Sequence, residues 1–255
     1  MVLHPEFSVK YFTAKIVERV SKGADSVSSQ AIYHNALRAH CKEQIEIVEG
    51  YYSVTKVNQH AVSLIAPNRW PRDCERVSVW KVEEKQTDVN LALQMFDDAI
   101  SGDVDQVILV TNDTDLSPAL KMIKDRCPRV VRGLVIPTTN ADISGGRERR
   151  ASGELVDLAN WTRHGIQDDE LRKSQLPDVV QGKRKASVKP ISWYPRPDLI
   201  EEMIKLVLPV LNKHNKVMKW ARESNQHFDG ASPLEMLETD EGAIKVFEYI
   251  KAYKE

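Results

Sequence analysis

Through the first two-thirds of the chain, short apolar runs alternate with stretches in which apolar residues recur at helical spacing. Strands are expected where β-branched and aromatic residues cluster, at residues 7–16, 45–54, 76–82, 106–111 and 130–136. Helices are expected between them, at residues 28–41, 87–100, 116–126 and 154–164. The run 106–111 is almost continuously apolar, which is typical of a strand buried on both faces of a parallel sheet. This alternation predicts an α/β three-layer sandwich with a mostly parallel sheet.

The pattern changes near residue 175. Residues 175–197 contain four prolines and a basic run, Lys183–Lys185, which together indicate a linker. Beyond it, residues 199–223 have helical spacing interrupted by Pro209, and residues 239–254 form another helical pattern. Between them, Ser232 and Pro233 are typical of a helix start. The chain is therefore predicted to have an α/β domain at 1–194 and a small all-α domain at 198–255.

Composition sets bounds on these domains. The chain has 255 residues, 42% of them hydrophobic and 29% charged, which suits one or two globular domains with real cores. The net charge is -1, so any nucleic-acid contact must come from a local basic patch. No apolar run is long enough to span a bilayer, and the first residues lack the layout of a signal peptide. Three scattered cysteines fit a reducing compartment. We therefore expect a cytoplasmic protein without a membrane partner.

Three carboxylates stand where chemistry could use them. Asp88 falls in the first turn of a predicted helix, and Asp113 and Asp115 follow the end of the buried strand 106–111. In open α/β sheets, ligands bind outside the carboxyl ends of the strands. Carboxylates gathered there repel one another unless a cation holds them, and clusters of oxygen ligands suit Mg²⁺ or Mn²⁺. The alternative is ordinary helix capping, since an Asp in a first turn or a polar loop before a helix is common.

The same residues carry a resemblance to a known family. Lys85–Ala92 (KQTDVNLA) followed by Thr111–Leu116 (TNDTDL) resembles the core of the NYN domain, a branch of the PIN-like nucleases, and the resemblance extends over about residues 5–194. It implies a PIN-like sandwich and hydrolysis of RNA phosphodiester bonds with Mg²⁺ or Mn²⁺. Asp88, Asp113 and Asp115 match the acids of the family's two motifs, which implies that they are both metal ligands and catalytic residues. Asp142 matches a fourth ligand only weakly.

One feature of the family is missing from this sequence. NYN domains normally open with a strand that ends in an Asp-Gly-x-Asn motif, and here the chain begins at what resembles the second strand. Two expectations follow. Either the native chain starts further upstream, or this is a degenerate member that binds RNA or a protein without cleaving. A missing strand would also leave one sheet edge unpaired.

The C-terminal region resembles a second family, the toxin-binding domain of Xre/ParS-type antitoxins. The match spans about residues 199–253, with Trp220, Asn225, Gly230, Pro233 and Gly242 in the family's positions. The resemblance implies a protein partner or self-association, as part of a system like a toxin–antitoxin pair. A generic helical appendage, in which Trp220 is a core residue, is the alternative.

A basic loop and several tryptophans complete the candidates. Arg147, Arg149 and Arg150 follow a predicted sheet strand and could contact RNA phosphates, or they could simply form a solvated loop. The tryptophans are interpreted as core residues rather than platforms for stacked bases, namely Trp70, Trp80, Trp161 and Trp193. The sequence therefore predicts a metal-dependent ribonuclease, with a non-catalytic RNA- or protein-binding protein as the alternative.

Overall fold

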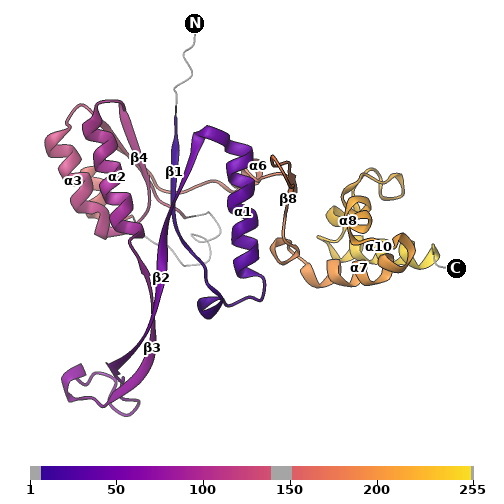
Figure 1. The fold of residues 1–255 in the computed structure, drawn as a ribbon, viewed down its shortest axis with the longest axis horizontal. Coiled ribbons are helices and arrows are strands. Elements are labelled where there is room, and N and C mark those ends of the chain that lie inside the picture. Colours follow the sequence, from indigo (N-terminus) through magenta and orange to yellow (C-terminus); the bar gives the residue numbers. More distant parts are fainter. Residues whose placement is uncertain (1–6, 139–150, 254–255) are drawn as a thin grey trace, which may run out of the picture. The chain divides into compact units, whose positions relative to one another are not determined.

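The computed structural model describes residues 7–138 and 151–253 (Figure 1). The chain divides into two compact units, Met1–Ser187 and Val188–Glu255. The first unit mixes helices and strands, and the second is helical except for a short strand at its start. A mixed α/β first unit followed by helices is what the alternation of apolar patterns predicts.

The first unit begins with a three-stranded sheet in the order β1-β2-β3. The strands are β1 (Val9–Lys15), β2 (Ile45–His60) and β3 (Arg76–Lys85). β1 runs parallel to the start of β2, and β3 runs antiparallel to the remainder of β2, from Tyr51 to His60. Beyond Tyr51 the sheet is therefore a two-stranded ribbon, which Figure 1 shows leading away from the helices.

A second sheet, in the order β4-β5-β6, is parallel throughout. Its strands are β4 (Gln106–Val110), β5 (Val131–Val135) and β6 (Trp161–Arg163). Residues 132–134 of β5, which has a neighbour on each side, are buried. Gly133 is required there, since a Cβ atom would lie 2.2 Å from the indole of Trp161 on β6. Contrary to the sequence prediction, β4 is not buried on both faces, since Ile108 and Val110 are more than half exposed and only Leu109 is buried.

Helices connect and cover these strands. They are α1 (Ser26–Cys41), α2 (Thr87–Ser101), α3 (Ser117–Arg126), α5 (Gly153–Leu158) and α6 (Asp168–Lys173). α2 packs against β1, β2 and β4, so a single helix contacts both sheets. Its inner face joins α3, β4 and β5 in one core around Leu120, Ile123 and Leu134, which are fully buried. This core fixes the carboxyl end of β4 relative to the start of α2.

Two expectations from the sequence need correction. The helix expected at 154–164 ends at Leu158, because Asn160 turns the chain and its side chain accepts a hydrogen bond from Arg132 N (2.9 Å). Residues 161–163 then pair with β5 as a strand. The strands of the described chain also form three separate sheets, two of three strands and one of two, so the parallel pairing is observed but a single three-layer sandwich stays a prediction.

The second unit has a core of its own. Its helices are α7 (Pro197–Leu211), α8 (His214–Arg222), α9 (Pro233–Met236) and α10 (Asp240–Ala252). Met203, Val217 and Val246 from three of these helices are completely buried together. Ser232 caps α9 as the sequence indicates. α7 continues past Pro209 and ends at Leu211, and Asn212 after it has a left-handed conformation. Across the described residues, no helix is both long and apolar enough to cross a membrane.

Short elements fill the stretch expected to be a linker. It contains the strands β7 (Val179–Val180) and β8 (Ser187–Val188), followed by a 3-10 turn at Ile191–Trp193. Tyr194, near the end of this stretch, is buried in the core of the helical unit. This basic, proline-rich stretch is therefore structured.

Candidate functional site

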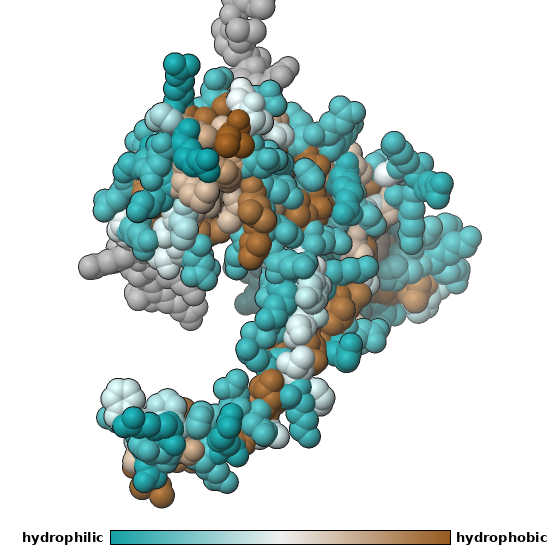
Figure 2. Space-filling model, turned by 60° about the vertical axis from the view of Figure 1, so that its left-hand side comes forward, coloured by the Kyte–Doolittle hydropathy of each residue, from teal (hydrophilic) through white to brown (hydrophobic). Residues whose placement is uncertain are grey.

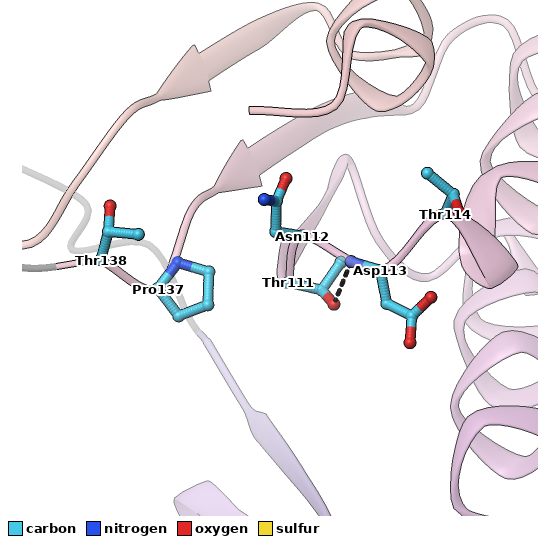
Figure 3. A pocket seen from close by; sticks show the side chains of 6 residues that line it. All are labelled: Thr111, Asn112, Asp113, Thr114, Pro137 and Thr138. Carbon is cyan, nitrogen blue, oxygen red and sulfur yellow. Dashed lines mark hydrogen bonds between the residues drawn. The ribbon is translucent and has the colours of Figure 1, made fainter. Parts of the chain in front are cut away.

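The chain beyond β4 forms a tight polar turn at the carboxyl end of the strand (Figure 3). Thr111 N donates to Val135 O (3.0 Å) and so extends the pairing of β4 with β5 by one residue. Asp113 N then donates to the Thr111 hydroxyl (3.1 Å), and Asp115 N donates to Asp113 Oδ1 (3.0 Å). The expected capping role is therefore real for Asp113. It holds the two acids in a fixed turn before α3.

Asp88 comes from a different part of the chain, directly after the turn between β3 and α2. β3 ends at Lys85, Gln86 takes a left-handed conformation (φ 72°), and Asp88 lies in the first turn of α2. Gly50 on β2 allows this turn, because a Cβ atom there would lie 2.4 Å from Lys85 O. The Thr87 hydroxyl donates to Glu84 Oε1 (2.6 Å), which fixes the helix start against the end of β3.

Neighbouring carboxylates oppose the negative charge of Asp88. The pKa of Asp88 is raised, first by partial burial and then by the negative charges of three other carboxylates. These carboxylates are Asp113, Glu84 and Asp115, in decreasing order of effect. The structure thus brings Asp88, Asp113 and Asp115 into one field of negative charge.

Sequence reasoning missed Glu84. It lies only four residues before Asp88, and the alternation of β3 could have placed it on a definite face of the strand. Its carboxylate also accepts a hydrogen bond from the Tyr52 hydroxyl (3.3 Å).

The donor chemistry of this cluster suits a hard divalent cation, since all four side chains are carboxylates. A cation would also relieve the repulsion that raises the pKa of Asp88. Within residues 7–138 and 151–253, however, no three His, Cys, Asp or Glu side chains are grouped closely enough to hold a metal ion together. The residue types fit a metal, whereas their present spacing is wider than a ligand set.

A polar hollow of about 510 Å³ lies beside the turn. Its lining comes from the ends of two parallel strands, Thr111–Thr114 after β4 and Pro137–Thr138 after β5. Figure 3 shows these side chains around the hollow, where Asp113 contributes the carboxylate. Such a position, outside the carboxyl ends of adjacent strands, is where open α/β sheets bind ligands.

Most of the predicted basic loop lies outside the described residues. Arg147, Arg149 and Arg150, together with Asp142, lie outside the described residues. The end of their loop is visible, because Ser152 N donates to the side chain of Asn112 (2.9 Å). The chain that follows the arginines is thus tied to the turn that carries Asp113.

Comparison with known families agrees with the motifs. The family model of the NYN domain matches residues 11–145. The model of the antitoxin Xre/MbcA/ParS C-terminal toxin-binding domain matches residues 210–255. Both resemblances inferred from the sequence are confirmed.

One curated relative is named as a monooxygenase and not as a nuclease. The chain is 46% identical over 246 residues to "6-hydroxy-3-succinoylpyridine 3-monooxygenase HspA" of Pseudomonas putida (strain DSM 28022 / S16). The match covers 96% of this chain and 76% of the relative. No solved structure matches the chain significantly.

Proposed function

The chain belongs to the NYN domain family, and on that premise we propose that it is a metal-dependent ribonuclease that hydrolyses RNA phosphodiester bonds. The observation that carries the proposal is the shared field of Asp88, Asp113 and Asp115, seen in the raised pKa of Asp88. These acids belong to the two family motifs, and Asp113 lines the hollow at the carboxyl ends of β4 and β5, where α/β sheets bind ligands.

Each residue near the hollow has a separate proposed role. Asp88, Asp113 and Asp115 would hold Mg²⁺ or Mn²⁺, which, when bound, supplies an activated water and a counter-charge for phosphate oxygens. The hydrogen bond from Asp115 N fixes the Asp113 carboxylate, so this group needs no reorientation when RNA arrives. The Thr111 hydroxyl lines the hollow and accepts from Asp113 N, so it can donate a hydrogen bond to a phosphate oxygen of the RNA. Arg147, Arg149 and Arg150 are proposed to contact RNA phosphates from the loop that Ser152 ties to Asn112.

The test is cleavage of single-stranded RNA by Asp113→Asn and Asp115→Asn variants in the presence of Mg²⁺ or Mn²⁺. Both should lose activity by about a hundredfold or more, because each removes a charge needed in the transition state. Asp105→Asn is the matched control, since exposed Asp105 lies before the opposite end of β4. Equal cleavage by all variants would show that Asp113 and Asp115 take no part in catalysis.

A second candidate function rests on the relative. Identity of 46% over 96% of this chain favours oxygenation of 6-hydroxy-3-succinoylpyridine or a similar hydroxylated pyridine. The hollow beside Asp113, at about 510 Å³, falls within the usual size range of small-molecule sites. Oxygen consumption that depends on this compound and on a supplied reductant would establish this function. Its absence, together with RNA cleavage, would favour the nuclease.

We also propose that the two three-stranded sheets belong to one PIN-like layer, because α2 packs on β1 and β4 together. Hydrogen exchange tests this arrangement. Slow exchange along the outer edges of both β1 and β4 would show that another strand pairs there. Fast exchange along both edges would contradict a single layer.

The C-terminal unit is proposed to bind a protein partner or a second copy of the chain, in a system like a toxin–antitoxin pair. The support is the family match at residues 210–255 and the separate core of the unit. A binding role does not depend on which reaction the first unit performs.

A further inference from the structure

The ribbon beyond Tyr51 has no third strand. β1 pairs with β2 only from Ile45 to Tyr51, whereas β2 and β3 continue to pair with each other as far as His60. Nine residue pairs lie beyond Tyr51, a length of about 30 Å. We call residues 56–81, the outer part of this ribbon with its connecting loop, the arm. Figure 2 shows it as a slender projection that mixes hydrophilic and hydrophobic residues.

The arm is basic although the chain is not. It contains five Lys and Arg against two Asp and Glu, a net charge of +3, while the whole chain has a net charge of -1. In the described chain, carboxylates lie near Arg72 (Asp73, 3.9 Å) and Lys81 (Glu83, 2.6 Å). No ion pair within the described residues engages the other three cations, Lys56, Arg69 and Arg76. A local basic patch of this kind is what nucleic-acid binding requires in a nearly neutral protein.

Two tryptophans are exposed on the arm, which corrects their interpretation as core residues. Trp70 and Trp80 each have 70% of their surface accessible. Trp80 lies directly opposite Lys56 in the strand register, and Arg76 shares its face of β3. Near the tip, a hollow of about 340 Å³ is lined by Trp70, Pro71 and Arg72. Each tryptophan thus stands beside a cation, the combination that binds stacked bases and their phosphates in single-stranded nucleic acids.

The arm leads to the acidic cluster. β3 runs from the arm through Glu84 to Lys85, and α2 begins at Thr87 with Asp88 in its first turn. Trp80 is five residues from the end of β3, about 17 Å along an extended strand. A polymer that lies along β3 would therefore reach from the arm to the acids, a distance that a small metabolite could not span.

We propose that the arm binds single-stranded RNA, with bases stacked on Trp70 and Trp80 and phosphates held by Lys56, Arg72 and Arg76. The proposal rests on the proposed function for the identity of the polymer, but it does not require cleavage. An exposed apolar loop with Val62, Leu64 and Ile65 belongs to the same arm and could instead face a second copy of the chain. The charge of +3 favours a polyanion.

The test is fluorescence anisotropy of a labelled oligouridine with the full chain in EDTA, so that binding is measured apart from metal-dependent cleavage. A Trp70→Ser, Trp80→Thr double variant should bind about tenfold more weakly or worse. Arg72→Gln and Arg76→Gln should each lower the slope of log affinity against log salt concentration by about 0.7. Tyr253→Ser and Lys245→Gln are the controls, since both residues are exposed in the other unit. Circular dichroism checks that the variants fold.

Each outcome decides a different question. Weaker binding by the arm variants alone supports the proposal, whether or not the wild type cleaves RNA. Equal binding by all variants, or no binding by the wild type, overturns it, and the cleavage assay then judges the acids separately. If the tryptophan variant instead halves the mass in light scattering and keeps its RNA affinity, the arm is a self-association surface. Duplex RNA should compete poorly, and equal competition would also contradict a stacking site.

Discussion

At Asp88 the native structure holds a carboxylate where partial burial and neighbouring acids oppose its charge. Such a residue lowers stability, and it persists at sites where function needs the charge. The sequence could place Asp88, Asp113 and Asp115 near one another because all three stand at element ends. It could not show that Glu84 joins them, since its place follows from the extension of β3 to Lys85.

An Asp88→Asn variant should be more stable than the wild type at neutral pH. The folded-state pKa of Asp88 is raised, so its contribution to stability is most favourable in acid and is lost as pH rises through that pKa. The gain from Asn should therefore shrink as pH falls and vanish below the ordinary Asp pKa of about 3.9. Urea unfolding at several pH values measures it, with Asp105→Asn as the control. A destabilised variant at neutral pH would contradict the raised pKa.

At the scale of the element, sequence periodicity predicts strands and helices better than it predicts where a turn ends one of them. Apolar spacing located β1 to β5 and α1 to α3, but it extended a helix to residue 164 and gave no sign of α6 or β7. The pairing of Trp161–Arg163 with β5 is a tertiary contact that the local pattern does not contain. Trp80 was assigned to the core because the sequence does not show that no layer covers the ribbon; in the structure it is exposed.

Gly50→Ala should damage the acidic cluster through the turn between β3 and α2. The added methyl group would meet Lys85 O and the Thr87 hydroxyl at 2.4 and 2.5 Å. We expect a loss of about 1–3 kcal/mol in the free energy of unfolding, and weaker cleavage because Asp88 shifts. Gly153→Ala is the control, because no atom lies within 4 Å of its added Cβ. Equal activity of the two variants would show that the turn does not position Asp88.

Ser232→Ala should weaken the helical unit. Ser232 and Glu235 form a reciprocal capping box at the start of α9, and the backbone hydrogen bond from Ser232 lowers the pKa of Glu235. Removing the hydroxyl should cost about 1 kcal/mol. Because the folded-state pKa of Glu235 is lowered, the cap stabilises fully above about pH 4.5 and is lost as pH falls through that folded-state pKa. Chemical unfolding of the full chain, followed by far-ultraviolet circular dichroism, measures the change. No change would exclude this role of the cap.

At the scale of the whole molecule, the chain joins an NYN unit to an antitoxin-like unit. The sequence could predict this because each unit carries its own motifs and its own core. The grouping of the strands into separate sheets could not be predicted, since strand order depends on contacts between distant segments.

If two copies of the chain associate through the helical unit, its exposed apolar residues should form the contact between them. Ile244 on α10 is 58% exposed, so Ile244→Glu should leave the fold intact and lower the mass measured by light scattering. Lys245→Glu, its exposed neighbour, is the matched control. An unchanged mass in both variants, with the wild type above 29.0 kDa, would place the contact elsewhere.

The most direct test of the central claim offers one preparation of the full chain two substrates in parallel. End-labelled single-stranded RNA is incubated with Mg²⁺ or Mn²⁺, and 6-hydroxy-3-succinoylpyridine is incubated with a reductant under air. We predict RNA cleavage that EDTA stops and that Asp113→Asn abolishes, with no consumption of oxygen linked to the pyridine. Intact RNA beside oxygenated pyridine would contradict the nuclease assignment and favour the activity named for the relative.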